Sequence, residues 1–126
     1  MAKKEIRTDL WVYDLLKDAN IKIDPQGCNI KEIDEALKTA SKKGTGNCGY
    51  PEYCGVVKDF VIVIEDKPTN DKQAKYNDNG ILDMQVSSIM DYALNGAYFY
   101  AKHILENTNY KKAIAFGISG DEKHHV

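Results

Sequence analysis

The charged residues that follow one strongly apolar segment are the first feature that could carry chemistry. Residues 61–67 read VIVIEDK, so four β-branched apolar residues lead directly into Glu65, Asp66 and Lys67. Apolar runs of this kind are typical of buried strands. Charges at the end of such a strand indicate either the place where it reaches solvent or part of a site that binds a cation and an anion.

A second carboxylate is expected beside this strand end because the sequence predicts a β-hairpin. The runs YCGVV and FVIVI are separated only by residues 58–59, which is the spacing of a two-residue turn. In that register Glu52 lies directly opposite Glu65. Opposed side chains have Cβ atoms about 5 Å apart, where like charges are destabilising unless a cation intervenes. Since side chains alternate along a strand, Lys67 shares the face of Glu65, and Asp66 points to the other face.

The cluster of Glu52, Glu65 and Lys67 predicts a magnesium site. Mg²⁺ binds one or two protein carboxylates together with water and phosphate oxygens. A neighbouring lysine can position or help deprotonate an attacking water and can stabilise charge that develops on phosphorus. The interpretation depends on the register, because a shift of one residue would separate the two glutamates. With a different turn, Asp59, which lies six residues before Glu65, is the alternative first carboxylate.

Composition limits the classes of function. The chain has 126 residues, of which 43% are hydrophobic and 29% charged, which suits one domain with a sizeable core. A formal charge of -2 gives no general attraction for nucleic acid, so DNA contacts must be local or supplied by another part of a larger protein. The cysteines and histidines lack zinc-ligand spacing, and reduced thiols are expected. No apolar run approaches the roughly 20 residues of a membrane span, so a cytoplasmic protein is expected.

Apolar spacing also predicts the elements that must position these charges. Ile6, Leu10, Tyr13 and Leu16 define the expected inner face of the first helix, and Trp11, Val12, Leu15 and Ala19 widen it. The first half of the chain is predicted to form a helix over 5–20, a short strand over 21–24, and a helix that is capped by Asn29 and Glu32 and ends near Gly44. Strands follow over 53–57 and 60–64, and then a polar connection over 68–82. The last elements are one long helix over 83–107 and a strand with a glycine turn over 111–120. Since a strand, a crossover helix and another strand form a parallel pair, the sheet of this α/β fold should be mixed.

These features resemble the PD-(D/E)XK nucleases. In that family an acidic residue after a proline precedes a strand that ends in (D/E)-x-K, and here Pro51-Glu52 and Glu65-Asp66-Lys67 match those elements. The predicted elements also follow the restriction-endonuclease-like αβββαβ core, a mixed central sheet flanked by helices, across nearly the whole chain. More narrowly, GYPEY, VIVIEDK, YALNGAYFYAKHIL and AIAFGISG resemble the N-terminal nuclease domain of type I restriction enzyme R subunits and the related domain fused to adenine-N6 DNA methyltransferases.

The resemblance implies a restriction-type endonuclease. Residues 1–126 would form a single domain, the N-terminal fragment of a longer restriction-modification protein. Its activity would be cleavage of phosphodiester bonds in double-stranded DNA that depends on Mg²⁺, with Mn²⁺ as a possible substitute, and that leaves 5′-phosphate and 3′-hydroxyl ends. Methyltransferase and target-recognition domains in the same chain or complex are the implied partners.

The resemblance also assigns roles to individual residues. Glu52 and Glu65 would bind the metal together with the backbone carbonyl of Asp66, and Lys67 would act on the attacking water. Glu5 matches the acidic residue that the family often contributes from its first helix. Two features depart from the family pattern. The first acidic residue is a glutamate where the family usually has aspartate, and Gln85 is not followed by the tyrosine of the QxxxY motif that some relatives carry.

Two other functions are compatible with the same residues. The first is a catalytically inactive domain of this fold that serves as a DNA- or protein-binding assembly module. The retained lysine and two carboxylates argue against it, since an inactive site has no need of all three. The second is a ligand-binding α/β domain that uses Gly117 and Gly120, although these glycines are typical of a turn after a strand.

Overall fold

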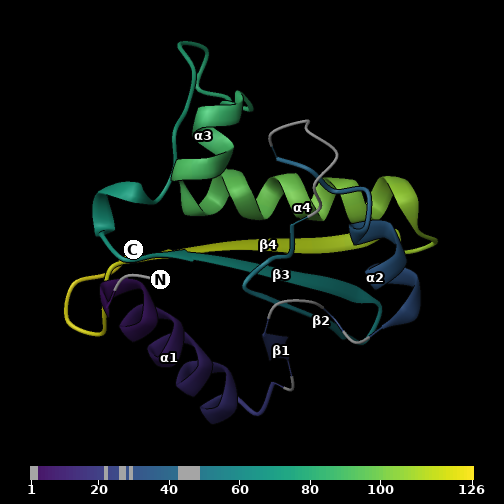
Figure 1. Ribbon diagram of the computed structural model, residues 1–126, viewed down its shortest axis with the longest axis horizontal. Helices are drawn as coiled ribbons and strands as arrows, with labels where there is room; N and C mark the ends of the chain where they lie inside the picture. Colours follow the sequence, from purple (N-terminus) through teal and green to yellow (C-terminus); the bar gives the residue numbers. More distant parts are fainter. Residues whose placement is uncertain (1–2, 22, 26–27, 29, 43–48) are drawn as a thin grey trace.

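A four-stranded mixed sheet in the order β1-β2-β3-β4 forms the middle layer of the chain (Figure 1). The computed structural model describes residues 3–21, 23–25, 28, 30–42 and 49–126. The elements are α1 (Lys3–Asp18), β1 (Asp24–Pro25), α2 (Lys31–Leu37), β2 (Tyr53–Val57), β3 (Phe60–Lys67), the 3₁₀ turn η1 (Asn70–Lys72), α3 (Val86–Asp91), α4 (Ala93–Asn107) and β4 (Lys112–Ser119). Their order confirms the α/β class and is compatible with the restriction-endonuclease-like αβββαβ core. Helix α2 is inserted before β2, and α3 precedes α4.

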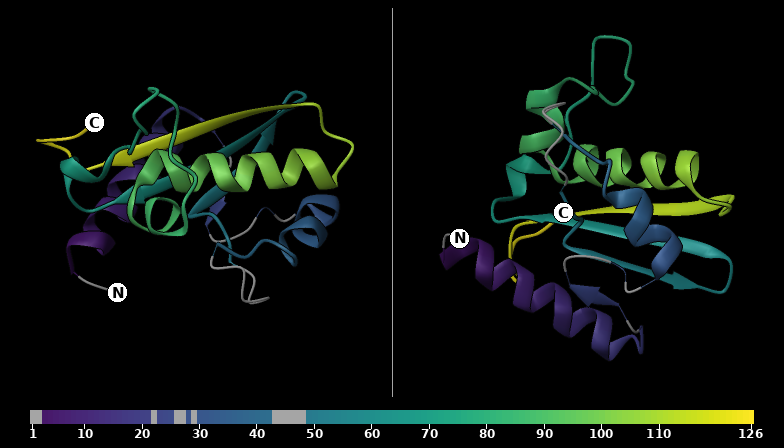
Figure 2. Two further views of the ribbon diagram at one scale, coloured as in Figure 1. Left: turned by 90° about the horizontal axis from the view of Figure 1, so that it is seen from above. Right: turned by 45° about the vertical axis from the view of Figure 1, so that its right-hand side comes forward.

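The helices cover the two faces of the sheet unequally. Helix α1 lies on one face, and α2, α3 and α4 lie on the other (Figures 1 and 2). In the part of the chain that the structure describes, no helix is both long enough and apolar enough to span a bilayer. The sheet therefore has an α1 face and an α4 face, and each residue of β3 must point to one of them.

The predicted hairpin and the predicted parallel pair are both present. β2 runs antiparallel to β3, with Tyr53 opposite Ile64 and Val57 opposite Phe60. Lys58 in the two-residue turn has a φ of 57°, the left-handed conformation that such turns require. β3 runs parallel to β4 along its whole length, from Phe60 beside Lys112 to Lys67 beside Ser119. The register fixes which residues of the three strands share a face.

The crossover contains two helices, where the sequence predicts one over residues 83–107. Tyr92 separates α3 from α4 with an extended backbone, φ -117° and ψ 137°. The N–H of Leu94 donates to the carbonyl of Gln73 at 2.9 Å, and the side chain of Asn95 bonds to backbone groups of the preceding connection. These tertiary hydrogen bonds fix the start of α4. The prediction of a single helix was wrong because apolar periodicity continues through the break.

Two other predicted boundaries also differ. Helix α2 ends at Leu37, well before the expected end near Gly44. After it, the N–H groups of Thr39 and Ala40 donate to the carbonyls of Ala36 and Leu37, three residues earlier, which is the pattern of a turn. Its N-cap position is occupied by Ile30, whereas Asn29 and Gly44 lie outside the described residues. The strand expected over 21–24 is replaced by β1, a two-residue pair with Cys54 and Tyr53 of β2.

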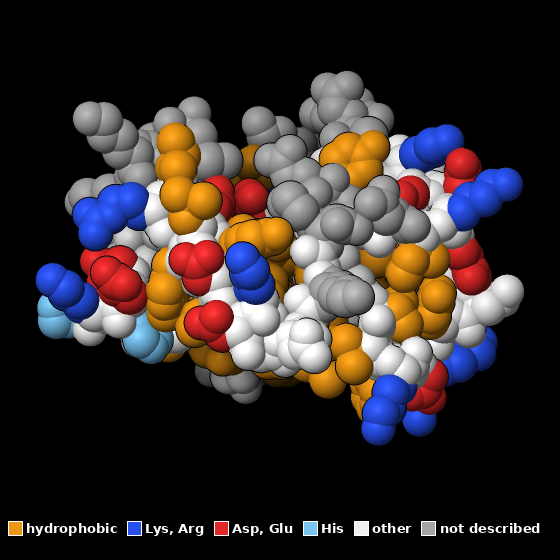
Figure 3. Space-filling view, turned by 90° about the horizontal axis from the view of Figure 1, so that it is seen from below, with side chains coloured by type: hydrophobic (Ala, Val, Ile, Leu, Met, Phe, Trp, Pro, Cys, Tyr) orange, Lys and Arg blue, Asp and Glu red, His pale blue; other side chains and the backbone are white. Residues whose placement is uncertain are grey.

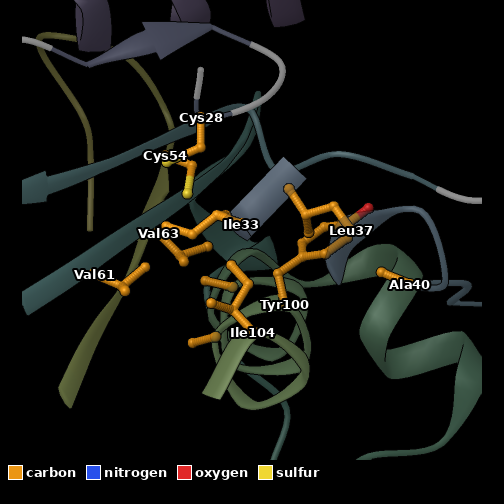
Figure 4. Close-up of a cluster of buried hydrophobic side chains, with 11 residues drawn as sticks. Cys28, Ile33, Leu37, Ala40, Cys54, Val61, Val63, Tyr100 and Ile104 are labelled. Carbon is orange, nitrogen blue, oxygen red and sulfur yellow. The ribbon is translucent and has the colours of Figure 1, made fainter. Parts of the chain in front are cut away.

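The larger core lies on the α4 face of the sheet, between α2, α4 and the inner side chains of β2 and β3 (Figure 4). Val61 and Val63 from β3 contact this cluster and are fully buried, as is Ile104 of α4. Cys28 and Cys54 are buried here as free thiols, which agrees with the expected reduced state for these two residues. A hydrogen bond with Cys28 and burial raise the pKa of Cys54, so the thiol stays protonated. Cys48 lies outside the described residues.

The smaller core joins α1 to the opposite face, and it uses only part of the predicted apolar stripe, namely Val12 with Trp11 and Leu16. Val12 is fully buried, whereas Ile6, Leu10 and Tyr13 are 43%, 61% and 44% exposed. Figure 3 shows hydrophobic side chains at the surface of this face. The hydroxyl of Thr8 donates to the carbonyl of Gly120 at 2.8 Å and so turns the face of Thr8 and Val12 toward the sheet. The helix has apolar residues on more than one side, and packing selects among them.

Gly117 allows the start of α4 to approach β4 closely. A Cβ added there would lie 2.5 Å from the backbone N of Leu94, which cannot move as a side-chain tip would. We expect Gly117→Ala to lower the free energy of unfolding by about 1–3 kcal/mol. Urea denaturation would measure the change. Ile114→Val on the same strand, at a position that is 40% exposed, is the control and should cost clearly less. Equal effects would show that the close approach is unimportant.

Candidate functional site

The last residues of β3 send charged side chains to both faces of the sheet. Glu65 lies beside Gly117 of β4, which faces the backbone of α4. Asp66 lies beside Ile118, which packs against the core on the α1 face. The alternation predicted from the sequence is therefore present, and it separates two adjacent carboxylates into different surroundings.

Glu65 is buried on the α4 face and held by two hydrogen bonds. Its Oε2 accepts from Lys42 Nζ and its Oε1 from the backbone N–H of Glu52, both at 3.0 Å. Lys42 Nζ also lies 4.9 Å from the centre of the Tyr100 ring. Gly96 leaves room for the carboxylate beside the first turn of α4, because a Cβ there would lie 3.2 Å from Glu65 Oε2. The partial positive charge at a helix start adds to the stabilisation of Glu65.

Lys67 lies on the same face, two residues along the strand. Its side chain is partly buried, and its Nζ donates to the carbonyl of Met90 in the last turn of α3 at 2.9 Å. The carbonyl of Lys67 accepts from the N–H of Gly120, which fixes the strand end. An ammonium group is thus held at the end of β3, on the side of the sheet where the Glu65 carboxylate lies.

Glu52 reaches this strand end through its backbone, and its side chain belongs to a second group. Strand pairing begins at Tyr53, so Glu52 lies just before β2. The backbone N–H of Glu52 donates to the Glu65 carboxylate. Its carboxylate forms a group with those of Asp9 and Asp66, in which the possible ligand oxygens lie within 4.8 Å of one another. The hairpin therefore brings the backbone of Glu52 to Glu65 and its carboxylate to Asp66.

Asp66 is the most unusual member of this group. It is 1% exposed, and neither of its carboxylate oxygens has a hydrogen-bond partner in the described part of the chain. Burial raises the pKa of Asp66 to about 10, and the nearby carboxylates of Asp9, Glu52 and Glu65 act in the same direction. Asp9 is fixed in turn by its carbonyl, which accepts from the Tyr53 hydroxyl at 2.6 Å. A proton or a cation is needed to offset the charge gathered here.

The remaining sequence candidates lie elsewhere. Asp59 is in the exposed hairpin turn, where it pairs with Lys112 at 3.2 Å. It lies six residues from Glu65 along β3, which corresponds to about 20 Å. Asp59 and Glu65 are therefore at opposite ends of the strand. Gln85 is exposed and precedes α3. Glu5 lies in α1, but its side chain is outside the described part of the structure.

The sequence interpretation did not identify three contributors to the strand end, namely Asp9, Lys42 and the side chain of Asp66. Asp9 could have been found, because it lies three residues before the buried Val12 and so shares a helical face with it. Lys42 begins a glycine-rich segment without apolar periodicity, and no local signal places it at Glu65. Asp66 was assigned only a backbone role because its side chain points away from Glu65.

Comparison with known proteins supports a restriction-modification relationship. The chain is 39% identical over 127 aligned residues to the type II restriction enzyme and methyltransferase RM.BcgI of Heyndrickxia coagulans. The chain is therefore similar to one segment of a restriction-modification protein. The alignment covers 99% of this chain but only 20% of RM.BcgI, so the chain spans about a fifth of the length of that protein. No protein-family model matches the sequence, and no solved structure matches it.

The buried charge of Asp66 makes a prediction about stability. In the unfolded chain this carboxyl ionises near pH 4, whereas in the fold its pKa is about 10. Folding at neutral pH therefore requires proton uptake, and without a divalent cation stability should fall as the pH rises from about 4 to about 10. We expect Asp66→Asn to raise the free energy of unfolding at pH 7 by an amount on the order of a few kcal/mol.

Chemical denaturation with a chelator present, at pH 4 and pH 7, would measure this difference. The gain from Asp66→Asn should shrink toward pH 4, since both folded and unfolded states then hold the proton. Asp59→Asn, on the exposed turn, is the matched control and should change stability by less than about 1 kcal/mol. Destabilisation by Asp66→Asn at pH 7 would contradict the prediction.

Proposed function

We propose that this domain is a Mg²⁺-dependent DNA endonuclease domain of a restriction-modification protein, which hydrolyses phosphodiester bonds of double-stranded DNA. The observation that carries the proposal is the 39% identity over 99% of the chain to a protein named as both restriction enzyme and methyltransferase. Residues 1–126 would be one domain of a longer protein, with methyltransferase and target-recognition domains as partners. The net charge of -2 fits a domain that relies on such partners to find DNA.

The residues at the strand end fit a hard divalent cation. Mg²⁺ prefers oxygen ligands, and the carboxylates of Glu52 and Glu65 together with the backbone carbonyl of Asp66 are the proposed set. Each carboxylate oxygen has two lone pairs, so the Glu65 oxygens that accept hydrogen bonds keep the capacity to bind a cation. When bound, Mg²⁺ would neutralise charge on the scissile phosphate and make the attacking water more acidic.

The chain itself supplies orientation and proton handling. Glu65 is held in one position by Lys42 and by the N–H of Glu52, so little reorganisation is needed when substrate binds. Lys67 uses one N–H on the carbonyl of Met90. Since an ammonium group has three donors, two remain for a phosphate oxygen and for the attacking water. Lys67 would stabilise the negative charge that develops on the phosphate and hold the water in line.

A second candidate is a catalytically inactive assembly module that binds DNA or protein. The specific observation in its favour is that Glu65 and Lys67 are both already paired within the fold, with Lys42 and with the Met90 carbonyl. Such pairing would stabilise the fold in the absence of any substrate. The two candidates differ in one measurable property, which is cleavage of DNA.

Cleavage of plasmid DNA in the presence of Mg²⁺ tests the proposal. We expect the unsubstituted chain to cut, and Glu65→Gln and Lys67→Ala each to lose activity on the order of a hundredfold or more. Asp59→Asn, at the other end of β3, should cut normally. Activity that survives both substitutions would overturn the site assignment. No cleavage by the unsubstituted chain, with Mg²⁺ or Mn²⁺, would favour the assembly module.

Calorimetric titration with Mn²⁺ tests the first carboxylate independently of DNA. Glu52→Gln should weaken binding, since this carboxylate lies among the acidic groups at the strand end. Asp59→Asn should leave binding unchanged because its carboxylate is exposed in the turn beside Lys112. The reverse result would return Asp59 to the site and would require a different position for the metal.

A further inference from the structure

We propose that a cavity beside the end of β3 binds a phosphate group of the DNA backbone, close to the phosphate that is cleaved. The cavity has a volume of about 250 Å³ and lies between residues 7–8 of α1, residues 68–70 after β3 and residues 120–124 after β4. These segments meet at the left end of the sheet in Figure 1. The inference rests on the proposed function, since it takes DNA to be the substrate, and it concerns residues that have no part in the proposed metal site.

Three polar side chains that line the cavity have donor groups available for a ligand. They are Arg7 of α1, Asn70 of η1 and His124 after β4. Among the described residues, no ion pair or side-chain hydrogen bond uses the guanidinium, amide or imidazole of these three. A guanidinium has five N–H donors, an amide has two, and an imidazole has at least one. Donors from three separate segments therefore converge on one cavity, which is the arrangement expected of a site for an oxyanion.

Asp121 is the acidic residue among those that line the cavity, and its carboxylate serves its own turn. Its Oδ1 accepts from the N–H groups of His124 and Lys123 at 2.8 and 2.9 Å. These hydrogen bonds lower the pKa of Asp121, and the charges of His124 and Arg7 act in the same direction. The ionised carboxylate thus attracts two basic side chains toward the cavity, while their N–H groups stay available for a ligand.

The cavity is fixed to the strand end that carries Lys67. Residues 68–70 continue the chain from Lys67, so the Cα of Asn70 lies within about 10 Å of that of Lys67. The N–H of Gly120 donates to the Lys67 carbonyl at 2.9 Å, and the Gly120 carbonyl accepts from the Thr8 hydroxyl at 2.8 Å. Phosphates on one DNA strand are spaced by about 3.4 Å along the helix axis. A strand with its scissile phosphate at Lys67 would therefore place a phosphate one to three nucleotides away in the cavity.

A second cavity, which shares Arg7 and Asp121 with the first, has a different chemical character. Its volume is about 220 Å³, and its other lining residues are Leu10, Trp11, Asp14 and Glu122. These side chains are apolar or acidic, and carboxylates repel a phosphate. The DNA backbone should therefore contact the cavity at the strand end and should not continue along α1.

Binding of a fluorescently labelled DNA duplex, measured by fluorescence anisotropy with a chelator present, tests the inference without cleavage. We expect Arg7→Gln to weaken binding about five- to tenfold at low salt, because one phosphate contact is lost. The slope of log affinity against log salt concentration should become shallower by about 1. Lys111→Gln is the matched control. It removes the same charge from an exposed residue just before β4, at the other end of the sheet from Lys67, and should leave both quantities nearly unchanged.

Asn70→Asp is a second variant that keeps the shape of the side chain. A carboxylate in place of the amide would repel a phosphate, so affinity for the duplex should fall at least as much as in Arg7→Gln. Asn20→Asp adds the same charge beyond the other end of α1, about 20 Å from Arg7, and should bind DNA almost normally. Circular dichroism should show that every variant folds.

The inference is overturned if the unsubstituted chain binds no DNA, or if Arg7→Gln and Lys111→Gln bind it equally well. Inorganic phosphate separates the two sources of a phosphate group. If phosphate raises the melting temperature of the unsubstituted chain and Arg7→Gln leaves DNA affinity unchanged, the cavity binds a free phosphate and the inference about DNA is wrong. A chain that binds DNA through Arg7 and Asn70 but does not cut it with Mg²⁺ would refute the nuclease proposal alone.

Discussion

The alternation of side chains along β3 is the constraint on which the arrangement of this protein depends. Three charged residues end the strand in succession, and helices cover both faces of the sheet. Glu65 and Lys67 must therefore point toward α4, and Asp66 must point toward α1. The backbone of a paired strand sets the face of each residue. The three charges therefore cannot share one face while β3 stays paired with β4.

The buried carboxylates on the two faces of the sheet have different surroundings. On the α4 face it supplies Lys42, the N–H of Glu52 and the start of a helix to the buried Glu65. Gly96 and Gly117 make this possible, since both allow the first turn of α4 to lie close to the sheet. On the α1 face the chain gathers more negative charge around Asp66, and it supplies no hydrogen bond to that carboxylate from the described residues. That contrast separates a site complete within the fold from one that needs a proton or an ion.

The similarity to RM.BcgI gives this arrangement a context. RM.BcgI is named as both a restriction enzyme and a methyltransferase, and the chain matches about a fifth of its length. The formal charge of -2 gives the chain no general attraction for nucleic acid.

Local sequence determined much of this structure. A β-branched run, a two-residue turn and a period-two pattern were sufficient for the β2–β3 register, because hairpin geometry depends on neighbours in the chain. The alternation of Glu65, Asp66 and Lys67 followed from the same pattern. Three features required the tertiary structure: the break at Tyr92, the buried side of α1, and the partners of the charged side chains. Contacts between distant segments decide each of these, such as Leu94 with Gln73 and Lys42 with Glu65. The sequence could therefore specify which face each charge occupies, and only packing could decide which of them would be left buried without a partner.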